Sequence, residues 1–146
     1  MVQVSRKFTV DSAPEPVVRY LRDFANTEQW DPGTVSCEHI GSDPIAVGAR
    51  WRNVSRFLGR ETELEYEMVR DEADRVEFVG RNKTATTIDS IRITPGPRVG
   101  TAVIDYVAHV ELNGLAKLAA PIARVAFEKL ADKVETRMTS VLATLD

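Results

Sequence analysis

Three residues of this sequence have the type and the position to do proton chemistry. Tyr66 and Tyr106 fall on the apolar faces of two predicted strands. A phenol hydroxyl there can hydrogen-bond a ligand or donate a proton, or it can fill the core and find a local partner. Asp89 falls among the odd-numbered, more apolar residues of a third predicted strand, where burial would raise its pKa and let it act as an acid or a base. If the parity of that strand is reversed, Asp89 is exposed and Ile88 is buried instead.

Strands with one buried face are the elements that must position these residues. Val2, Val4, Phe8 and Val10 alternate with polar residues, which is typical of a half-buried strand. Similar patterns between turn residues predict seven strands, at residues 2–10, 35–40, 48–58, 61–69, 75–81, 84–94 and 101–112. Most connections between them are short, so we expect the sheet to be antiparallel.

Helical signals stand after the first strand and at the end of the chain. Ser12 and Glu15 have the spacing of a capping box, which predicts a helix followed by a second short turn that carries Trp30. Residues 115–146 predict one long amphipathic helix of roughly 45 Å, and Pro121 predicts a kink or a broken start in it. Its apolar stripe consists of Leu118, Ile122, Ala126, Leu130, Val134, Met138, Val141 and Leu145.

The third and fourth strands predict a hairpin whose two-residue turn is Gly59-Arg60. The register of that turn places Trp51 opposite Met68 on one face and arginines opposite glutamates on the other. A solvated ladder of matched charges explains the second face, and an anion-binding site is the alternative.

The dry face of the sheet and the apolar stripe of the last helix would cover each other. This predicts an α+β fold, a seven-stranded curved antiparallel sheet wrapped around a long C-terminal helix, with two short helices after the first strand. The inward face includes polar Asn53 and Ser55, which need partners or water when buried, and small Ala102 and Ala108. Small and polar residues in the middle of an inward face are typical of a cavity lining.

Composition excludes several classes of function. The 146 residues have the size of one domain, 1–146, and the charges are mixed with a net value of −3, so no nucleic-acid surface is expected. No run approaches the ~20 apolar residues of a membrane span, and the alternating N-terminus is unlike a signal peptide. Cys37 is the only cysteine, which excludes an internal disulfide and suits the cytoplasm. Without H-x-x-x-H or C-x-x-C spacings, a phosphate loop or a dinucleotide motif, we expect neither metal nor cofactor.

Four segments carry a resemblance to a known family. They are residues 26–32 (NTEQWDP), 47–51 (VGARW), 57–64 (FLGRETEL) with Tyr66, and 101–106 (TAVIDY). Together with the order of elements, they resemble the START-like proteins of helix-grip fold, in particular the bacterial polyketide cyclase/dehydrase and lipid-transport domains. The resemblance spans nearly the whole chain. It implies a hydrophobic pocket between the sheet and the long helix, with an entrance near the short second helix.

Trp30 and Asp31 lie where the resemblance places this entrance. In one interpretation, Trp30 gates the pocket and Asp31 orients a polar end of the ligand. In the other, Trp30 is a hydrophobic anchor and Asp31 caps the turn before Pro32.

The sequence favours the binding or carrying of a hydrophobic or amphipathic small molecule, such as a lipid, a polyketide-like or an aromatic compound. The alternative is a cofactor-free polyketide cyclase or dehydratase in which Asp89, Tyr66 or Tyr106 transfers a proton. The candidate ligand-binding residues are Trp30, Trp51, Asn53, Tyr66, Met68, Phe78, Asp89, Tyr106, Ala108 and Ile122.

Residues 115–123 are apolar nearly all round, with Lys117 as their sole charge. This segment is interpreted as a door for the ligand, a dimer contact, a patch that touches a membrane without stable insertion, or a segment buried under loops. A third and weaker function, a module that binds a partner protein, would use the same segment. We expect a monomer or a homodimer.

Overall fold

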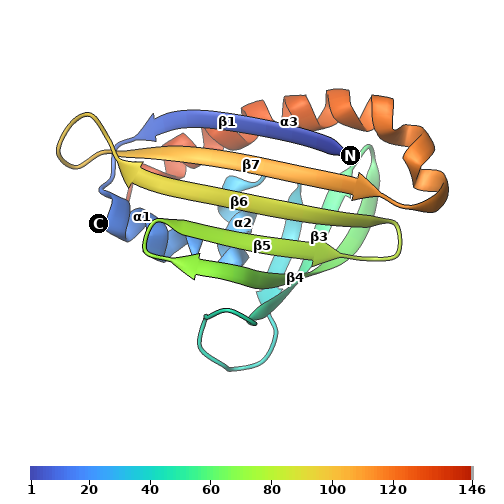
Figure 1. Ribbon diagram of the computed structural model, residues 1–146, viewed down its shortest axis with the longest axis horizontal. Helices are drawn as coiled ribbons and strands as arrows, with labels where there is room; N and C mark the ends of the chain where they lie inside the picture. Colours follow the sequence, from blue (N-terminus) through green and yellow to red (C-terminus); the bar gives the residue numbers. More distant parts are fainter. Residues whose placement is uncertain (146) are drawn as a thin grey trace.

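The computed structural model describes residues 1–145 and, within them, one antiparallel sheet of seven strands (Figure 1). The strands are β1 (Val2–Val10), β2 (Thr34–His39), β3 (Arg50–Phe57), β4 (Arg60–Glu72), β5 (Arg75–Arg81), β6 (Ala85–Pro95) and β7 (Ala102–Leu112). Their order in the sheet is β1-β7-β6-β5-β4-β3-β2. Each strand from β2 onward therefore lies beside the next one in the chain, which confirms the predicted antiparallel sheet.

Helices cover the inner face of the sheet. After β1 come α1 (Pro14–Leu21), the 3-10 helix η1 (Phe24–Asn26) and α2 (Thr27–Trp30), and after β7 come the 3-10 helix η2 (Gly114–Ala119) and α3 (Ala120–Leu142). Helix α3 packs against β1 and α2, and Figure 1 shows it running along β1. The predicted α+β helix-grip architecture is confirmed. Among the described residues, no helix is both long and apolar enough to cross a membrane.

The C-terminal helix begins with the broken start that Pro121 predicted. Regular α-helix begins only with α3, and Pro121 lies in its first turn, where the missing N–H needs no partner. The predicted apolar stripe is wrong at this end, because Leu118 and Ile122 are exposed. Nearly every residue in these turns is apolar, so the pattern there does not fix the rotation of the helix. Asp146, the end of the predicted helix, lies outside the described residues.

The β3–β4 hairpin turns one residue earlier than predicted. Leu58 and Gly59 form its centre with φ values of 53° and 77°, the left-handed pair of a type I′ turn, whose twist matches that of the flanking strands. The register is therefore displaced by two residues, and Trp51 lies opposite Tyr66 instead of Met68. A displacement of two keeps every side chain on its predicted face.

The outward face of this hairpin carries the predicted ladder of charges. Arg56 pairs with Glu61 at 2.7 Å and Arg52 pairs with Glu63 at 3.0 Å. All four side chains are about half exposed or more, and exposed pairs of this kind each contribute little to stability. The face is a solvated ladder in which Arg52 and Arg56 are each paired with a glutamate.

Ser12 does not form the predicted capping box. The residue at the N-cap of α1 is Ala13, which makes no side-chain hydrogen bond. The hydroxyl of buried Ser12 instead donates to the backbone carbonyl of Leu142. The tertiary contact satisfies a carbonyl at the end of α3 and ties the start of α1 to it.

An aromatic cluster fills the space beneath the middle of the sheet. Phe24 is at its centre, with its ring 4.4 Å from the rings of both Tyr66 and Phe78. Trp51 and Trp30 contact the same phenylalanine edge-on, at 6.2 and 6.3 Å. The indole N–H of Trp51 donates to a carboxylate oxygen of Asp23 at 3.1 Å. This part of the core is solid.

Candidate ligand-binding site

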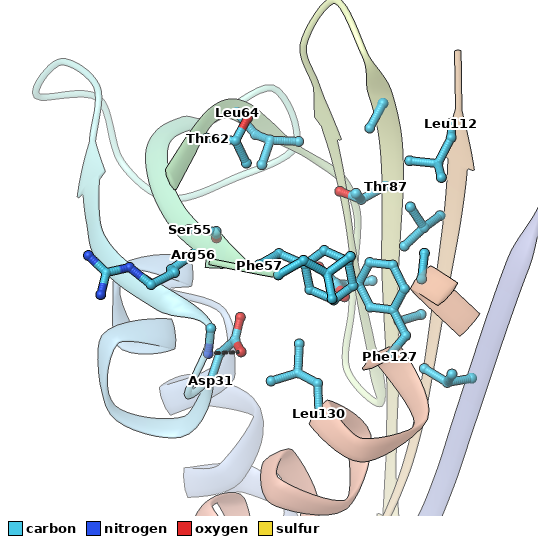
Figure 2. A pocket seen from close by; sticks show the side chains of 18 of the residues that line it. Asp31, Ser55, Arg56, Phe57, Thr62, Leu64, Thr87, Leu112, Phe127 and Leu130 are labelled. Atoms are coloured by element: carbon cyan, nitrogen blue, oxygen red, sulfur yellow. Dashed lines mark hydrogen bonds between the residues drawn. The ribbon is translucent and has the colours of Figure 1, made fainter. Parts of the chain in front are cut away.

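A cavity of about 480 Å³ lies between the sheet and α3. Its wall comes mainly from the β3–β4 hairpin, β6, β7, η2 and α3. Figure 2 shows side chains of the hairpin, β6, β7 and α3 around it. Most of the wall is apolar and includes Leu64, Ala85, Ala108, Val110, Leu112, Ala123, Phe127, Leu130, Ala131 and Val134. A cavity of this size and composition is typical of a small-molecule site.

The cavity exists because small side chains face each other across it. Ala123 and Ala131 present methyl groups from α3, and Ala108 presents one from β7. An inward-facing leucine or phenylalanine at these positions would project into the space. The sequence predicted small inward-facing side chains at Ala108 and in the alanine-rich helix start, and the structure places both on the cavity wall.

Asp89 projects from β6 into the cavity, so the predicted parity of that strand is confirmed. The side chain is buried, with a residue exposure of 9%, and the hydroxyl of Tyr106 donates to its Oδ1 at 2.9 Å. Burial, together with repulsion from Asp31, raises the pKa of Asp89 to about 7, although the hydrogen bond from Tyr106 opposes the rise. Near neutral pH, Asp89 can therefore both take and give a proton.

Tyr66 brings a second hydroxyl to the cavity. Thr87 on β6 donates to the Tyr66 hydroxyl at 3.0 Å. The two residues flank Gly80 of β5, where an added Cβ would lie only 2.6 Å from the Tyr66 ring, so this glycine provides the room for the ring. Burial raises the pKa of Tyr66 and of Tyr106 well above the usual tyrosine value, which keeps both hydroxyls protonated.

Asp31 is a second carboxyl group on the cavity wall. Its Oδ1 accepts from the Gly33 N–H and its Oδ2 accepts from the Thr34 hydroxyl, both at 2.9 Å. Burial raises its pKa despite these hydrogen bonds. Asp31 thus holds the turn after α2, as the second interpretation expected, and it also faces the cavity (Figure 2).

Tyr66, Asp89, Tyr106 and Ala108 are the predicted ligand-binding residues that the structure brings together at the cavity. The predicted members outside its wall are Trp30, Trp51, Asn53, Met68, Phe78 and Ile122. Four of these, the two tryptophans, Met68 and Phe78, belong to the solid core. Strand alternation identifies the inward face, but it does not tell which part of that face lies over the helix and which over the aromatic cluster.

Asn53 and Ile122 lie outside the cavity for other reasons. The Asn53 amide donates to the Thr34 hydroxyl, and its side-chain oxygen accepts from Ser55, so strand-to-strand contacts satisfy it. Ile122 points away from the sheet and is 65% exposed. Trp30, 2% exposed, packs against Tyr106 with ring centroids 6.0 Å apart; it is the hydrophobic anchor of the two interpretations.

The predicted ligand-binding residues missed most of the contribution of α3, although Leu130 and Val134 belong to its predicted apolar stripe. Phe127 and Leu130 line the cavity, and the Phe127 ring stacks on Phe57 of the hairpin with centroids 4.2 Å apart (Figure 2). The spacing of 123, 127, 130, 131 and 134 is that of one helix face. The sequence contains this face, but apolar residues on the outer side of the same turns give a second apolar face that the pattern cannot distinguish from it.

The exposed part of the cavity wall lies at the hairpin tip, at the β5–β6 turn and in η2. Leu58, Thr84 and Ala119 line the cavity and are exposed, whereas the resemblance implied an entrance near α2. On the outer side of η2 and α3, four large apolar residues are 57–86% exposed, namely Leu115, Leu118, Ile122 and Val125. The interpretation of this segment as buried under loops is therefore wrong.

No group of three or more potential metal ligands gathers within residues 1–145.

Together, the curved sheet, the long C-terminal helix and the hollow between them define the class, a START-like helix-grip protein with an internal cavity. A family model described as polyketide cyclase / dehydrase and lipid transport matches residues 1–143. The chain belongs to this family. Among curated proteins, none matches the sequence.

Solved structures share the fold at low identity. A START superfamily protein from Mycobacterium smegmatis is 14% identical, with 96% of each chain covered and a TM-score of 0.78. The Zhui aromatase/cyclase from Streptomyces sp. R1128 is 12% identical over 97% of this chain and 90% of that one, with a TM-score of 0.73. A protein from Thermus thermophilus is 18% identical over 95% of this chain and 98% of that one, with a TM-score of 0.69. These similarities show the fold.

Proposed function

We propose that this protein encloses and carries a largely apolar small molecule. The observation that carries the proposal is the cavity of about 480 Å³, whose wall is mainly alanine, leucine, valine and phenylalanine. Such a wall favours an apolar guest because the guest loses contact with water without leaving polar wall atoms unpaired. Family membership supports the proposal, since the family description includes lipid transport.

The direct test fills the cavity and measures binding of a neutral fluorescent probe, N-phenyl-1-naphthylamine. Ala108→Leu adds three carbons inside the cavity, and we expect it to weaken probe binding at least tenfold. Ala73→Leu is the matched control, because Ala73 is exposed in the β4–β5 turn and lies away from the cavity. Circular dichroism confirms that both variants are folded. Equal probe binding by the wild type and Ala108→Leu would overturn the proposal.

The second candidate function is a cofactor-free cyclase or dehydratase. The observation that favours it is the contact between Asp89 and Tyr106 inside an apolar cavity, with the pKa of Asp89 at about 7. Asp89 would remove a proton from a methylene carbon between two ketones, and the resulting enolate would form a C–C bond to another carbonyl carbon. A tyrosine hydroxyl would protonate the new alkoxide and recover its proton from Asp89.

Turnover separates this candidate from a carrier. A linear poly-β-keto thioester is the substrate, and product is followed by mass spectrometry. If the protein is an enzyme, Asp89→Asn lowers the rate by about 100-fold or more and keeps N-phenyl-1-naphthylamine binding, whereas Asp43→Asn on an exposed loop keeps both. An unchanged rate in Asp89→Asn excludes Asp89 as the base.

We also propose a cytoplasmic location. Cys37 is a buried free thiol, and burial raises its pKa to about 11, so the thiol stays protonated and unreactive. A single inert thiol suits a reducing compartment. Fractionation of source cells, with the protein detected by antibody, tests the location.

A further inference from the structure

Two hydrogen-bonded pairs of polar side chains lie together on the sheet side of the cavity wall. Thr87 and Asp89 are two residues apart on β6 and so point to the same face of the sheet. Thr87 is hydrogen-bonded to the Tyr66 hydroxyl from β4, and Asp89 is hydrogen-bonded to the Tyr106 hydroxyl from β7. The other polar side chains on the wall are exposed, as those of Arg60, Glu61 and Thr84 are, or already hydrogen-bonded within the protein, as those of Asp31, Ser55, Thr62 and Asn82 are. The two pairs are therefore the interior place where a polar group of a guest can be satisfied.

One carboxylate oxygen in this group has no protein partner. Asp89 Oδ1 accepts the Tyr106 hydroxyl, but no donor among the described residues hydrogen-bonds Oδ2. Two side-chain atoms among the described residues are inaccessible and lack a hydrogen-bond partner, and Asp89 Oδ2 is not one of them. It therefore reaches the cavity space as a free acceptor, next to apolar surface that offers nothing in exchange.

A free donor lies nearby. Thr87 and Tyr66 share one hydrogen bond between two hydroxyl groups, and each hydroxyl has one proton. Whichever of the two donates, the other keeps a proton without an acceptor among the described residues. The same part of the wall thus offers one strong acceptor and one donor.

Within residues 1–145, no cation lies inside the cavity to balance a charged guest. Of the three basic residues on its wall, Arg56 is bound to Glu61 and its side chain is 63% exposed. Arg60 is exposed at the hairpin tip. His109 belongs to the odd-numbered residues of β7, whose side chains point to the opposite face from Tyr106 and Ala108. A buried anion would instead face the carboxyl groups of Asp31 and Asp89.

We propose that the ligand is an apolar molecule whose polar end is a neutral hydroxyl group, bound between Asp89 and the Tyr66–Thr87 pair, and that the cavity rejects ligands that end in a carboxylate. A ligand hydroxyl group fits because it can donate to Asp89 Oδ2 and accept the proton that the Tyr66–Thr87 pair does not use between its two members. The proposal rests on the proposed function of enclosing an apolar molecule. The pKa of about 7 for Asp89 supports it by making the rejection of anions stronger above neutral pH.

Three naphthalene probes of similar size test the proposal by isothermal titration at pH 8. They are 2-naphthalenemethanol, its methyl ether, which lacks the donor, and 2-naphthoate, which is an anion. In the wild type, we expect the alcohol to bind at least tenfold more tightly than either of the others. Asp89→Asn should reduce the preference for the alcohol over naphthoate to less than threefold, because it removes the negative charge. Asp43→Asn should leave the preference unchanged.

A pH series on the wild type gives a second measurement that needs no variant. Between pH 8 and pH 6, Asp89 gains a proton, so naphthoate should bind more tightly while the alcohol changes little. In Asp89→Asn, this trend should be lost. Naphthoate binding as tightly as the alcohol at pH 8, or a preference that survives Asp89→Asn, would overturn the inference. Failure of all three probes and of N-phenyl-1-naphthylamine would instead overturn the proposed function.

Discussion

Two parts of the space beneath one sheet differ in how they are filled. Under the middle strands, Phe24 enters from η1 and packs within 4.4 Å of Tyr66 and Phe78. Under the neighbouring part, α3 offers Ala123 and Ala131, and a cavity of about 480 Å³ is left. The strands alternate in the same way over both parts. The difference shows that the covering segment, together with the small Ala108 on the sheet, decides where this protein is hollow.

Tyr66 stands at the border of these two parts. Its ring packs against Phe24, and its hydroxyl lies on the cavity wall beside Thr87. The aromatic cluster thus fixes the position of the Tyr66 ring, and the Tyr66 hydroxyl is presented to the cavity. The following predictions test this division, beginning with the largest expected effect.

Truncation should cost much more in the solid part than beside the cavity. Phe78→Ala removes a fully buried ring and should lower the free energy of unfolding by about 3–5 kcal/mol. Leu130→Ala, on the wall of an existing cavity, should cost about 1–2 kcal/mol. Urea denaturation of both variants measures the difference. Equal costs would mean that the two parts are packed alike.

The buried carboxyl group of Asp89 should make the protein less stable as pH rises. Its pKa is about 7 in the folded state and about 4 in an unfolded chain. Its protonated form favours folding, so this contribution is complete below pH 4, falls between pH 4 and 7, and is absent above pH 7. Asp89→Asn should therefore gain stability relative to the wild type across that interval, by up to about 4 kcal/mol. Denaturation at pH 5, 6, 7 and 8 checks the trend, and a constant difference would contradict it.

Neighbours of Asp89 should move its pKa in opposite directions. Tyr106→Phe removes a hydrogen bond that lowers the pKa and should raise it, whereas Asp31→Asn removes a repelling charge and should lower it. The asparagine side chain would keep an oxygen to accept from Gly33. Carboxyl carbon NMR follows the titration of Asp89 directly. Shifts in the same direction would show that the two residues do not act independently on Asp89.

The smallest effect is expected at the hairpin tip that overhangs the cavity. Leu58 adopts a left-handed conformation with φ of 53°, which costs about 1 kcal/mol for a residue with a branched side chain. Leu58→Asn creates the Asn-Gly pair that type I′ turns prefer and should raise stability by about 0.5–1 kcal/mol. Leu58→Ala is the control, because it removes the same side chain but keeps the unfavourable backbone. Thermal unfolding should rank Asn above Ala.

The sequence predicted the fold and the face of each strand well, because alternation reports burial directly. Asp89 was identified in this way, because the odd-numbered residues of its strand are the more apolar set. The same rule placed Trp51 and Phe78 on the inward face but not under the right part of the sheet, since that depends on where Phe24 and α3 lie. Ile122 was misplaced because its turn is apolar on all sides. Only the three-dimensional structure shows which apolar residues line the cavity, which belong to the aromatic cluster and which are exposed.

The two halves of helix α3 differ in how deeply they are buried. Its large buried residues, Val134, Met138 and Leu142, lie in its second half, whereas the buried residue of its first turns is the small Ala123. The Ser12 hydroxyl donates to the Leu142 carbonyl in the final turn. The first turns, which form a wall of the cavity, have outer faces that nothing in the described residues covers. The first turns of α3 therefore combine an inner face of small residues at the cavity with an outer face of exposed apolar residues, while the second half of the helix is packed into the core.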